Sequence, residues 1–198
     1  MNRIRVFLPL AVGPILWLVA SLAPAYAFDA EQLLAELSQN KQGQATFVET
    51  KYLAVLERPI KSSGTLSFQS PARIEKNTLE PKREVLVLDG DTLTVTRDGR
   101  TMTVNLRDHA QVLSFVEAIR GVLLGNVQVL DQVYKIQVSG NEANWRMVLT
   151  PRDAKLASMI KEIRMGGGGG RVRSVEYVEP NGDHAVMQID PVRVSEKE

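Results

Sequence analysis

The sequence has 198 residues and no cysteine, and its 24 lysine and arginine residues nearly balance 23 aspartate and glutamate residues. A formal net charge of +1 lacks the basic excess that binding to a phosphate backbone usually requires, which argues against nucleic acid as a partner. The absence of cysteine excludes disulfide bonds, thiolate metal ligands and thiol nucleophiles, so stability must come from hydrophobic packing.

The first 27 residues have the pattern of a secretory signal peptide. Two arginines precede an almost wholly apolar run at residues 6–22, and Ala25-Tyr26-Ala27 offers the small residues that signal peptidases recognise. An uncleaved membrane anchor is the alternative, but proline and glycine interrupt the apolar run. We therefore expect a cleaved signal at residues 1–27, export to a periplasm, and a single domain at residues 28–198.

The first expected element is a short amphipathic helix. Asp29 followed three residues later by Gln32 resembles a capping box, in which side chains bond the free N–H groups at a helix start. Leu33, Leu34 and Leu37 then fall on one side of the helix, which is expected to end near residues 40–43.

Residues 45–56 form the first expected strand, and its apolar side carries charges. Because successive side chains alternate between the two faces of a strand, Phe47, Glu49 and Lys51 share a face with Leu53 and Val55. A solvated edge strand protected by charge explains this pattern. The alternative is that Glu49 and Lys51 stand at the mouth of a cavity, where they meet a polar head group.

The next segment predicts further antiparallel strands. Residues 62–76 alternate polar and apolar side chains, stop at Pro71 and resume, which indicates a strand pair, and residues 83–88, 93–96 and 101–106 continue the sheet. Asp-Gly pairs at positions 89–90 and 98–99 adopt positive φ at low cost and therefore indicate hairpins. Threonines gather on one face of the last two strands, which predicts that this face is wet.

A second helix and the remaining strands follow. Asp108 with Gln111 repeats the capping-box pattern, and an apolar stripe at residues 112–123 runs until Gly125-Asn126 ends the helix. Strands are expected at residues 133–138, 145–149, 160–165, 172–178 and 185–189. The glycines at 166–170 predict a flexible hairpin loop; a phosphate-binding loop is disfavoured, because no Lys-Ser/Thr pair or helix start follows them.

These elements predict an α+β fold, a strongly curved antiparallel sheet covered by helices. About ten strands exceed the usual open sheet and favour strong curling. Periodicity cannot separate an ordinary filled core from a ligand cavity on the concave face. The side chains expected there are Leu66, Phe68, Leu86, Leu88, Leu93, Val95, Met102, Val104, Leu106, Trp145, Met147, Leu149, Ile163, Met165, Val175 and Tyr177.

The sequence shows no catalytic motif. His109 and His184 are the only groups that titrate near neutral pH when unperturbed, and both read as surface residues outside any metal or triad spacing. Nucleophile-elbow, zinc-protease and nucleotide-loop motifs are absent from the sequence. We therefore predict no catalytic residue, metal site or cofactor, although scattered carboxylates such as Glu49 and Glu176 keep a hydrolase open as an alternative.

Residues 64–93 resemble the central segment of the LolA-like outer-membrane lipoprotein carriers. The matching positions are Gly64, Leu66, Pro71, Pro81, Asp89, Gly90 and Leu93. Phe47 fits the aromatic residue on the family's first strand, and residues 149–152 resemble its Leu-Thr-Pro-Lys segment, after which a short helix and three strands follow. The resemblance implies an incomplete antiparallel β-barrel, a half-pipe closed by helices, over essentially the whole of residues 28–198.

The function implied by this resemblance is that of a periplasmic carrier rather than an enzyme. It would bind the acyl chains of a lipoprotein or other lipid-linked cargo and move the cargo from the inner towards the outer membrane. Its partners would be an inner-membrane donor and an outer-membrane acceptor, and the carrier would be a monomer. Ser70 stands where the family commonly has an arginine implicated in release to the acceptor, and Ser67, Lys76 and Thr94 replace common aromatics. These departures point to another lipid as cargo.

The resemblance also implies a set of site residues. The mouth of the cavity would carry Glu49, Lys51 and Arg73, and the helix at residues 112–123 would act as a lid. Two alternatives remain: an interaction module with a filled core that binds a protein at a strand edge, and a hydrolase of lipid-like substrates. The lining residues would be Phe47, Leu66, Phe68, Leu86, Leu88, Leu93, Val95, Met102, Val104, Phe115, Ile119, Trp145, Met147 and Ile163.

Overall fold

The computed structural model describes residues 28–192, and the predicted signal at residues 1–27 lies outside the described residues. This range contains eleven strands and four α-helices. In chain order they are α1 (Ala30–Leu37), β1 (Gln42–Tyr52), β2 (Ile60–Gln69), β3 (Arg73–Glu80), β4 (Glu84–Asp89), β5 (Thr92–Arg97), β6 (Arg100–Asn105), the 3₁₀ turn η1 (Leu106–Asp108), α2 (Ala110–Leu124), α3 (Val127–Val133), β7 (Tyr134–Asn141), β8 (Asn144–Pro151), α4 (Ala154–Ala157), β9 (Glu162–Gly168), β10 (Arg171–Val178) and β11 (His184–Pro191).

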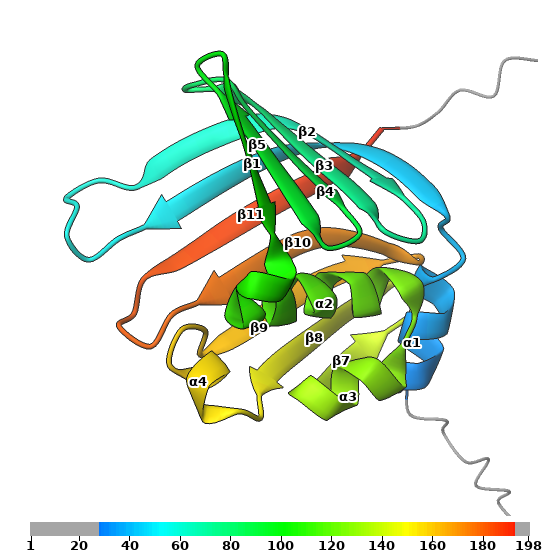
Figure 1. The fold of residues 1–198 in the computed structure, drawn as a ribbon. Coiled ribbons are helices and arrows are strands. Elements are labelled where there is room, and N and C mark those ends of the chain that lie inside the picture. The colour runs from blue at the N-terminus through cyan, green and yellow to red at the C-terminus, as the bar shows by residue number, and fades with distance from the viewer. Residues whose placement is uncertain (1–27, 193–198) are drawn as a thin grey trace, which may run out of the picture.

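All eleven strands form one antiparallel sheet that does not close. Its order is β6-β5-β4-β3-β2-β1-β11-β10-β9-β8-β7, so β1 and β11 join the two halves of the chain in the middle and β6 and β7 are the edges. Figure 1 shows the sheet curving around α2, with β2 to β5 above this helix and β7 and β8 below it. The predicted fold, a curved antiparallel sheet covered by helices, is confirmed.

The half of the sheet from β7 to β10 is filled by helices. Leucines of α1 and α3 and the buried side of α2 pack against Trp145, Met147 and Leu149 of β8 and Ile163 of β9, all of which are almost completely buried. Burial of this many large apolar side chains supplies most of the hydrophobic stabilisation. No helix within residues 28–192 is long and apolar enough to cross a membrane.

Helix α2 also contacts the other half of the sheet. A small second cluster joins Val116 of α2 to Leu88 of β4 and Leu106 of η1, with Ile74 and Leu93 against it. One helix therefore bridges both halves. We call β2 to β6 the wing, and the surface of the wing on the α2 side the wing face.

The pairing register confirms the predicted concave face. Leu66 pairs with Lys76, Lys76 with Leu86, Leu86 with Val95 and Val95 with Met102, so these residues stand in one row across the wing. In the other half, Trp145, Met147 and Leu149 pair with Gly167, Met165 and Ile163. Side chains of directly paired residues lie on the same face of a sheet, so each row has one side.

The helix boundaries bear out one predicted cap and correct another. Asp29 Oδ1 accepts a hydrogen bond from the Gln32 N–H at 2.9 Å, as the capping box predicted. Asp108 is not the cap of α2, because it belongs to the preceding 3₁₀ turn and the helix begins after His109. Gly125 ends α2 in the left-handed conformation as predicted, but Asn126 immediately caps a further helix, α3, which was not predicted.

The predicted glycine loop at residues 166–170 is wrong in part. Strand β9 continues through Gly168, and only Gly169 and Gly170 form the turn, with φ of 57° and 64°. The glycines inside the strand each have a close neighbour. A Cβ on Gly167 would lie 1.9 Å from the Arg171 carbonyl oxygen and 2.6 Å from Trp145 Cζ2, and a Cβ on Gly168 would lie 2.0 Å from the Ala143 carbonyl oxygen. A glycine within a strand commonly marks such a close approach.

Candidate functional site

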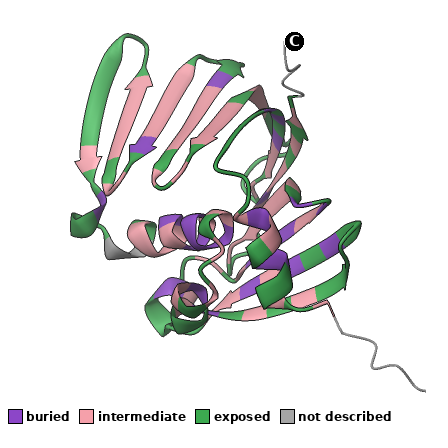
Figure 2. Cartoon of the chain, turned by 90° about the vertical axis from the view of Figure 1, so that its right-hand side faces the viewer, coloured by how far each residue is buried: buried purple, intermediate pink, exposed green. Residues whose placement is uncertain are grey.

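The wing face is apolar but only partly covered. Near α2, Leu88 is 7% exposed, whereas Leu86 and Val95 in the next row are half-buried and Met102 at the sheet edge is 59% exposed. Figure 2 shows the same contrast, with buried residues gathered around the helices and mostly intermediate burial along the wing strands. Exposed apolar side chains that adjoin one another usually mark a binding surface.

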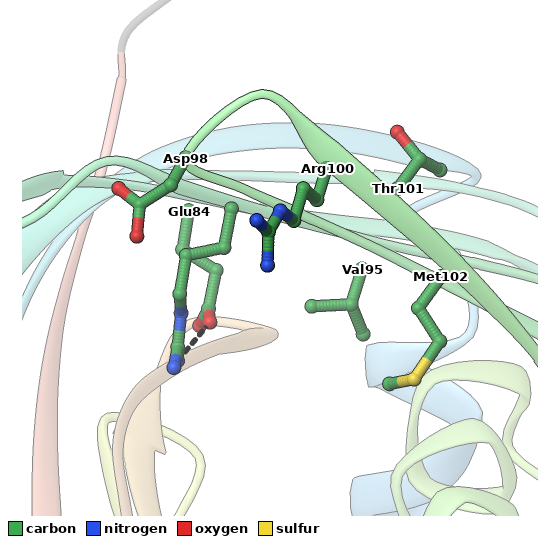
Figure 3. A pocket seen from close by; sticks show the side chains of 7 residues that line it. Glu84, Val95, Asp98, Arg100, Thr101 and Met102 are labelled. Atoms are coloured by element: carbon green, nitrogen blue, oxygen red, sulfur yellow. Dashed lines mark ion pairs between the residues drawn. The ribbon is translucent and has the colours of Figure 1, made fainter.

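A hollow of about 920 Å³ opens at the end of the wing face farthest from α2. This volume falls within the range of roughly 300–1,000 Å³ that is typical of ligand sites. In Figure 3, Val95, Met102 and Arg100 point to the same side of the strands, and Glu84 forms an ion pair there with Arg97. The hollow therefore has an apolar wall and a charged rim. Its lining residues are Glu84, Val95, Arg97, Asp98, Arg100, Thr101 and Met102.

A cluster of charges sits on the inner face where β1 meets the wing. Glu49 is only 5% exposed, and its Oε2 accepts hydrogen bonds from Lys76 Nζ at 2.7 Å and from Ser62 Oγ at 3.3 Å. Lys51 Nζ lies 3.9 Å from the same oxygen. The Lys76 ammonium also stands 4.9 Å from the centroid of the Phe47 ring, a cation–π arrangement. We call Glu49, Lys51, Ser62 and Lys76 the Glu49 cluster.

Tyr177 links this cluster to α2. Burial raises the pKa of the Tyr177 hydroxyl, and the negative charge of Glu49 raises it further, so the hydroxyl stays neutral at ordinary pH. The Tyr177 ring meets Phe115 of α2 edge to face, with ring centroids 6.4 Å apart. The charged cluster and the covering helix therefore share one neighbourhood.

The predicted lining residues fall into two groups. Trp145, Met147 and Ile163 lie inside the packed half of the molecule, and Phe47 of β1 lies beside Lys76 of the Glu49 cluster; all four are at most 2% exposed. The others lie on the wing face or on α2. Leu88 among them is buried; those with a partly exposed surface are Leu66, Phe68, Leu86, Leu93, Val95, Met102, Val104, Phe115 and Ile119. The structure thus brings the second group together around an open surface and places the first group in the core.

The predicted mouth residues are also divided. Glu49 and Lys51 lie together on the inner face, but Arg73 points to the outer face, because Ile74 next to it points inward. There Arg73 pairs with Asp89 at 3.2 Å and Glu75 at 3.6 Å. The structure does not bring Arg73 to Glu49. Lys76 takes that place, and the one local signal of it is a charged residue at an inward position of an otherwise apolar row.

A second ionic cluster, not foreseen from the sequence, ties α2 to the wing. The buried Arg120 of α2 forms ion pairs with Glu117 at 2.8 Å and Asp91 at 3.6 Å, and donates to the carbonyl of Gly90. Arg107 donates to Asp91 at 2.6 Å, and this hydrogen bond is the main reason why the pKa of Asp91 lies below its ordinary value. The turn between β4 and β5 is therefore fastened to the helix.

His184 begins β11 rather than lying in a turn as predicted, and His109 is the residue before α2. His184 stacks on Tyr52 with ring centroids 4.6 Å apart, and its Nδ1 lies 3.1 Å from the Gly182 carbonyl oxygen. His109 immediately precedes α2 and is exposed. Within the described range, no group of three or more His, Asp or Glu side chains is placed to hold a metal ion.

Known proteins match this chain over more than four fifths of its length. A family model described as "Outer membrane lipoprotein carrier protein LolA-like" matches residues 22–189. An outer-membrane lipoprotein carrier protein of Dechloromonas aromatica (strain RCB) is 22% identical over 169 residues, or 85% of this chain and 78% of the relative. Among solved structures, a LolA superfamily protein from Nitrosomonas europaea aligns with a TM-score of 0.43 and 10% identity over 85% of this chain and 95% of its own. The lipoprotein LppX of Mycobacterium tuberculosis aligns with a TM-score of 0.44 and 12% identity over 82% and 98%.

Proposed function

Because this chain belongs to the family of LolA-like outer membrane lipoprotein carrier proteins, we propose that it binds the acyl chain of a lipoprotein or other lipid-linked cargo on the wing face. One observation carries the proposal: the row from Leu86 to Met102 is apolar, yet α2 covers only the base of the surface to which it belongs. The family consists of carriers rather than enzymes.

The physical need for such a surface is large. Exposing an acyl chain to water costs about 0.8 kcal/mol per methylene, so a sixteen-carbon chain carried bare would cost roughly 12 kcal/mol. A carrier must offset this cost and still release its cargo. Leucine, valine and methionine side chains suit that task, because their contacts with a hydrocarbon are non-directional and can rearrange.

Helix α2 is the proposed cover of the site. Phe115 and Ile119 of this helix are both half-buried, and Phe115 packs against the core of the packed half. We infer that α2 packs on the base of the wing when the carrier is empty and shifts when a chain enters, as lids do in other binding proteins. The lining residues Trp145, Met147 and Ile163 then support the site from the core, and Phe47 supports it beside Lys76.

The route of transport is part of the same proposal. The family is periplasmic, and for this chain we propose export by a cleaved signal at residues 1–27, one carrier domain at residues 28–198, and a monomer. A donor protein at the inner membrane would load it and an acceptor at the outer membrane would unload it. Ser70 in place of the family's common arginine supports a lipid cargo other than an ordinary lipoprotein.

The test is the binding of a fluorescent fatty acid to matched variants on β4. Leu86→Glu places a carboxylate on the wing face, where a bound tail would have to desolvate it, so binding should weaken at least about tenfold. Val87→Glu, one residue on, points to the outer face and is similarly half-buried, so it should bind as the unmodified protein does. Circular dichroism checks that both variants fold.

Two results would contradict the proposal. A purified protein that excludes the fatty acid altogether would favour an interaction module with a filled core. Equal weakening by Leu86→Glu and Val87→Glu would show that the wing face is not where the chain binds.

A further inference from the structure

We propose that the Glu49 cluster is the seat of an anionic head group, so that the cargo is an acidic amphiphile with a carboxylate or phosphate beside its acyl chain. This inference rests on the proposed function and specifies its cargo. Lys76 and Lys51 would hold the anion, and the tail would lie along the wing face.

The charges of the cluster do not balance. Lys51 and Lys76 both approach Glu49 Oε2, at 3.9 and 2.7 Å, so two ammonium groups share one carboxylate. Among the described residues, neither lysine has another ion-pair partner. Burial above all, and then the charges of Glu49, Glu179 and Asp183, raise the pKa of the neighbouring Tyr177, so its hydroxyl adds no negative charge. Among the described residues, Glu179 and Asp183 form no ion pair with either lysine. The cluster therefore carries one surplus positive charge at the edge of an apolar surface, where an incoming anion would neutralise it.

The two cations are accessible, although the carboxylate is not. The side chain of Lys76 is 19% exposed and that of Lys51 is 40% exposed, while Glu49 lies beneath them. A ligand that approaches from the wing face thus meets ammonium groups before it meets the carboxylate. The hydroxyl of Ser62 donates to the same carboxylate oxygen at 3.3 Å and so helps to hold Glu49 in place.

The cluster is also placed correctly for an amphiphile. Lys76 begins the row that continues through Leu86, Val95 and Met102 on successive strands. At about 4.8 Å between neighbouring strands, this row runs roughly 14 Å from Lys76 to Met102, of which about 10 Å, from Leu86 onward, is apolar. A head group at Lys76 therefore has a path for its tail directly beside it.

A structural ion pair accounts for these features less well than an anion site does. A buried ion pair contributes little net stability, and a second ammonium at one carboxylate adds repulsion between the cations that a further anion would relieve. Here a second cation is present, and the first remains partly open to solvent. Both features are what capture of an anion requires.

The test compares palmitate with methyl palmitate, which has the same tail and no charge. Their binding to residues 28–198, the chain without the proposed signal, is measured by displacement of a neutral fluorescent acyl ester. We expect the protein to bind palmitate about tenfold more tightly than the ester, and Lys76→Met to abolish that preference while the ester binds as before. Lys51→Met should reduce the preference in part. Lys61→Met, an exposed lysine on the outer face of β2, is the matched control and should change nothing.

Glu49→Gln gives the sharpest discrimination, because the two explanations predict opposite signs. Removal of the competing carboxylate should strengthen palmitate binding several-fold if the lysines hold an anion. If the ion pair only supports the fold, the same change should weaken binding of palmitate and ester alike. Glu49→Gln therefore tests the proposal even if Lys76→Met does not fold. Lys76→Arg, which keeps the positive charge, should keep the preference for palmitate over methyl palmitate.

The outcomes separate this inference from the proposed function. Equal affinity for palmitate and methyl palmitate would overturn the head-group seat while acyl binding stands. Binding of neither would overturn both. Hexadecyl phosphate should displace the probe if the anion is a phosphate attached to a tail. Displacement by inorganic phosphate at the same concentration would overturn the assignment of an amphiphile.

Discussion

At the scale of single residues, the packed half of the molecule depends on one close approach. Trp145 is almost fully buried, and the ring lies over Gly167 of the neighbouring strand, where no side chain fits. A run of glycines that reads as a loop in the sequence is therefore needed for packing. Because the Trp145 ring and the Arg171 and Ala143 carbonyls that occupy the space come from other segments, the reason for Gly167 and Gly168 is visible only in the structure.

Gly167→Ala should destabilise the fold by about 1 to 3 kcal/mol, because the added methyl must displace the Trp145 ring or the Arg171 carbonyl. The free energy of unfolding in urea measures the effect. Gly43→Ala in β1 is the control, since a Cβ there meets nothing within 4 Å, and it should stay within roughly 0.5 kcal/mol of the unmodified protein. Equal stability of both variants would show that the ring moves aside without cost.

At the scale of elements, strands and turns were predictable and long-range partners were not. Alternation of side chains and the Asp-Gly turns at 89–90 and 98–99 are local signals, and the strands they predicted are present. Helix α3 was missed because Gly125 ends α2 and Asn126 starts the next helix without a gap. Lys76 and its partner Glu49 are 27 residues apart in the sequence, and Arg120 and its partner Gly90 are 30 apart. Local sequence patterns cannot reveal contacts at such separations. The alternation of side chains predicted which residues lie on the inner face of the sheet, but not which of them α2 covers.

The tie between α2 and the β4–β5 turn should depend on pH. The pKa of Asp91 is held below its ordinary value of 3.8 in the folded protein, mainly by the hydrogen bond from Arg107. The carboxylate therefore adds stability above that value, and the contribution is lost as pH falls through the lower folded pKa. Asp91→Asn should be less stable than the unmodified protein near pH 6 and equally stable at strongly acidic pH.

Unfolding curves measured across this pH range check the expectation, and hydrogen exchange locates it. Amides of α2 should exchange faster in Asp91→Asn, while those of β8 and β9 in the packed half remain protected. A difference between the two proteins that stays constant down to strongly acidic pH would contradict the role assigned to the carboxylate.

At the scale of the whole molecule, one half of the sheet stabilises the fold and the other offers a surface. Leu149 on β8 is completely buried beneath the helices, whereas Leu86 in the wing is only half-buried on the same face of the sheet. Identical residues in the two halves therefore have different physical roles. The free energy of folding thus comes mainly from the packed half, whereas the apolar surface of the wing remains free to contribute to ligand binding.

Two leucine substitutions should show this division. Leu149→Ala should cost about 2 to 5 kcal/mol of unfolding free energy, because it leaves a cavity in a packed core. Leu86→Ala should cost less than roughly 1.5 kcal/mol, because the side chain is partly solvated already. Binding of a fatty acid should respond in the opposite order, with the larger loss for Leu86→Ala. Parallel effects on stability and binding would mean that the two halves are not separate in function.

The sheet ends at β6 and β7, and these two strands are not paired with each other. In a closed barrel, the number of strands and their stagger fix the internal diameter, so a ligand that is too wide cannot enter. Here β6 and β7 do not pair, so the internal diameter is not fixed. The opening should be able to widen for a branched or double acyl chain without breaking a hydrogen bond between strands. For the proposed carrier, we therefore expect weak selection by the thickness of the tail, with discrimination between cargoes resting on the Glu49 cluster.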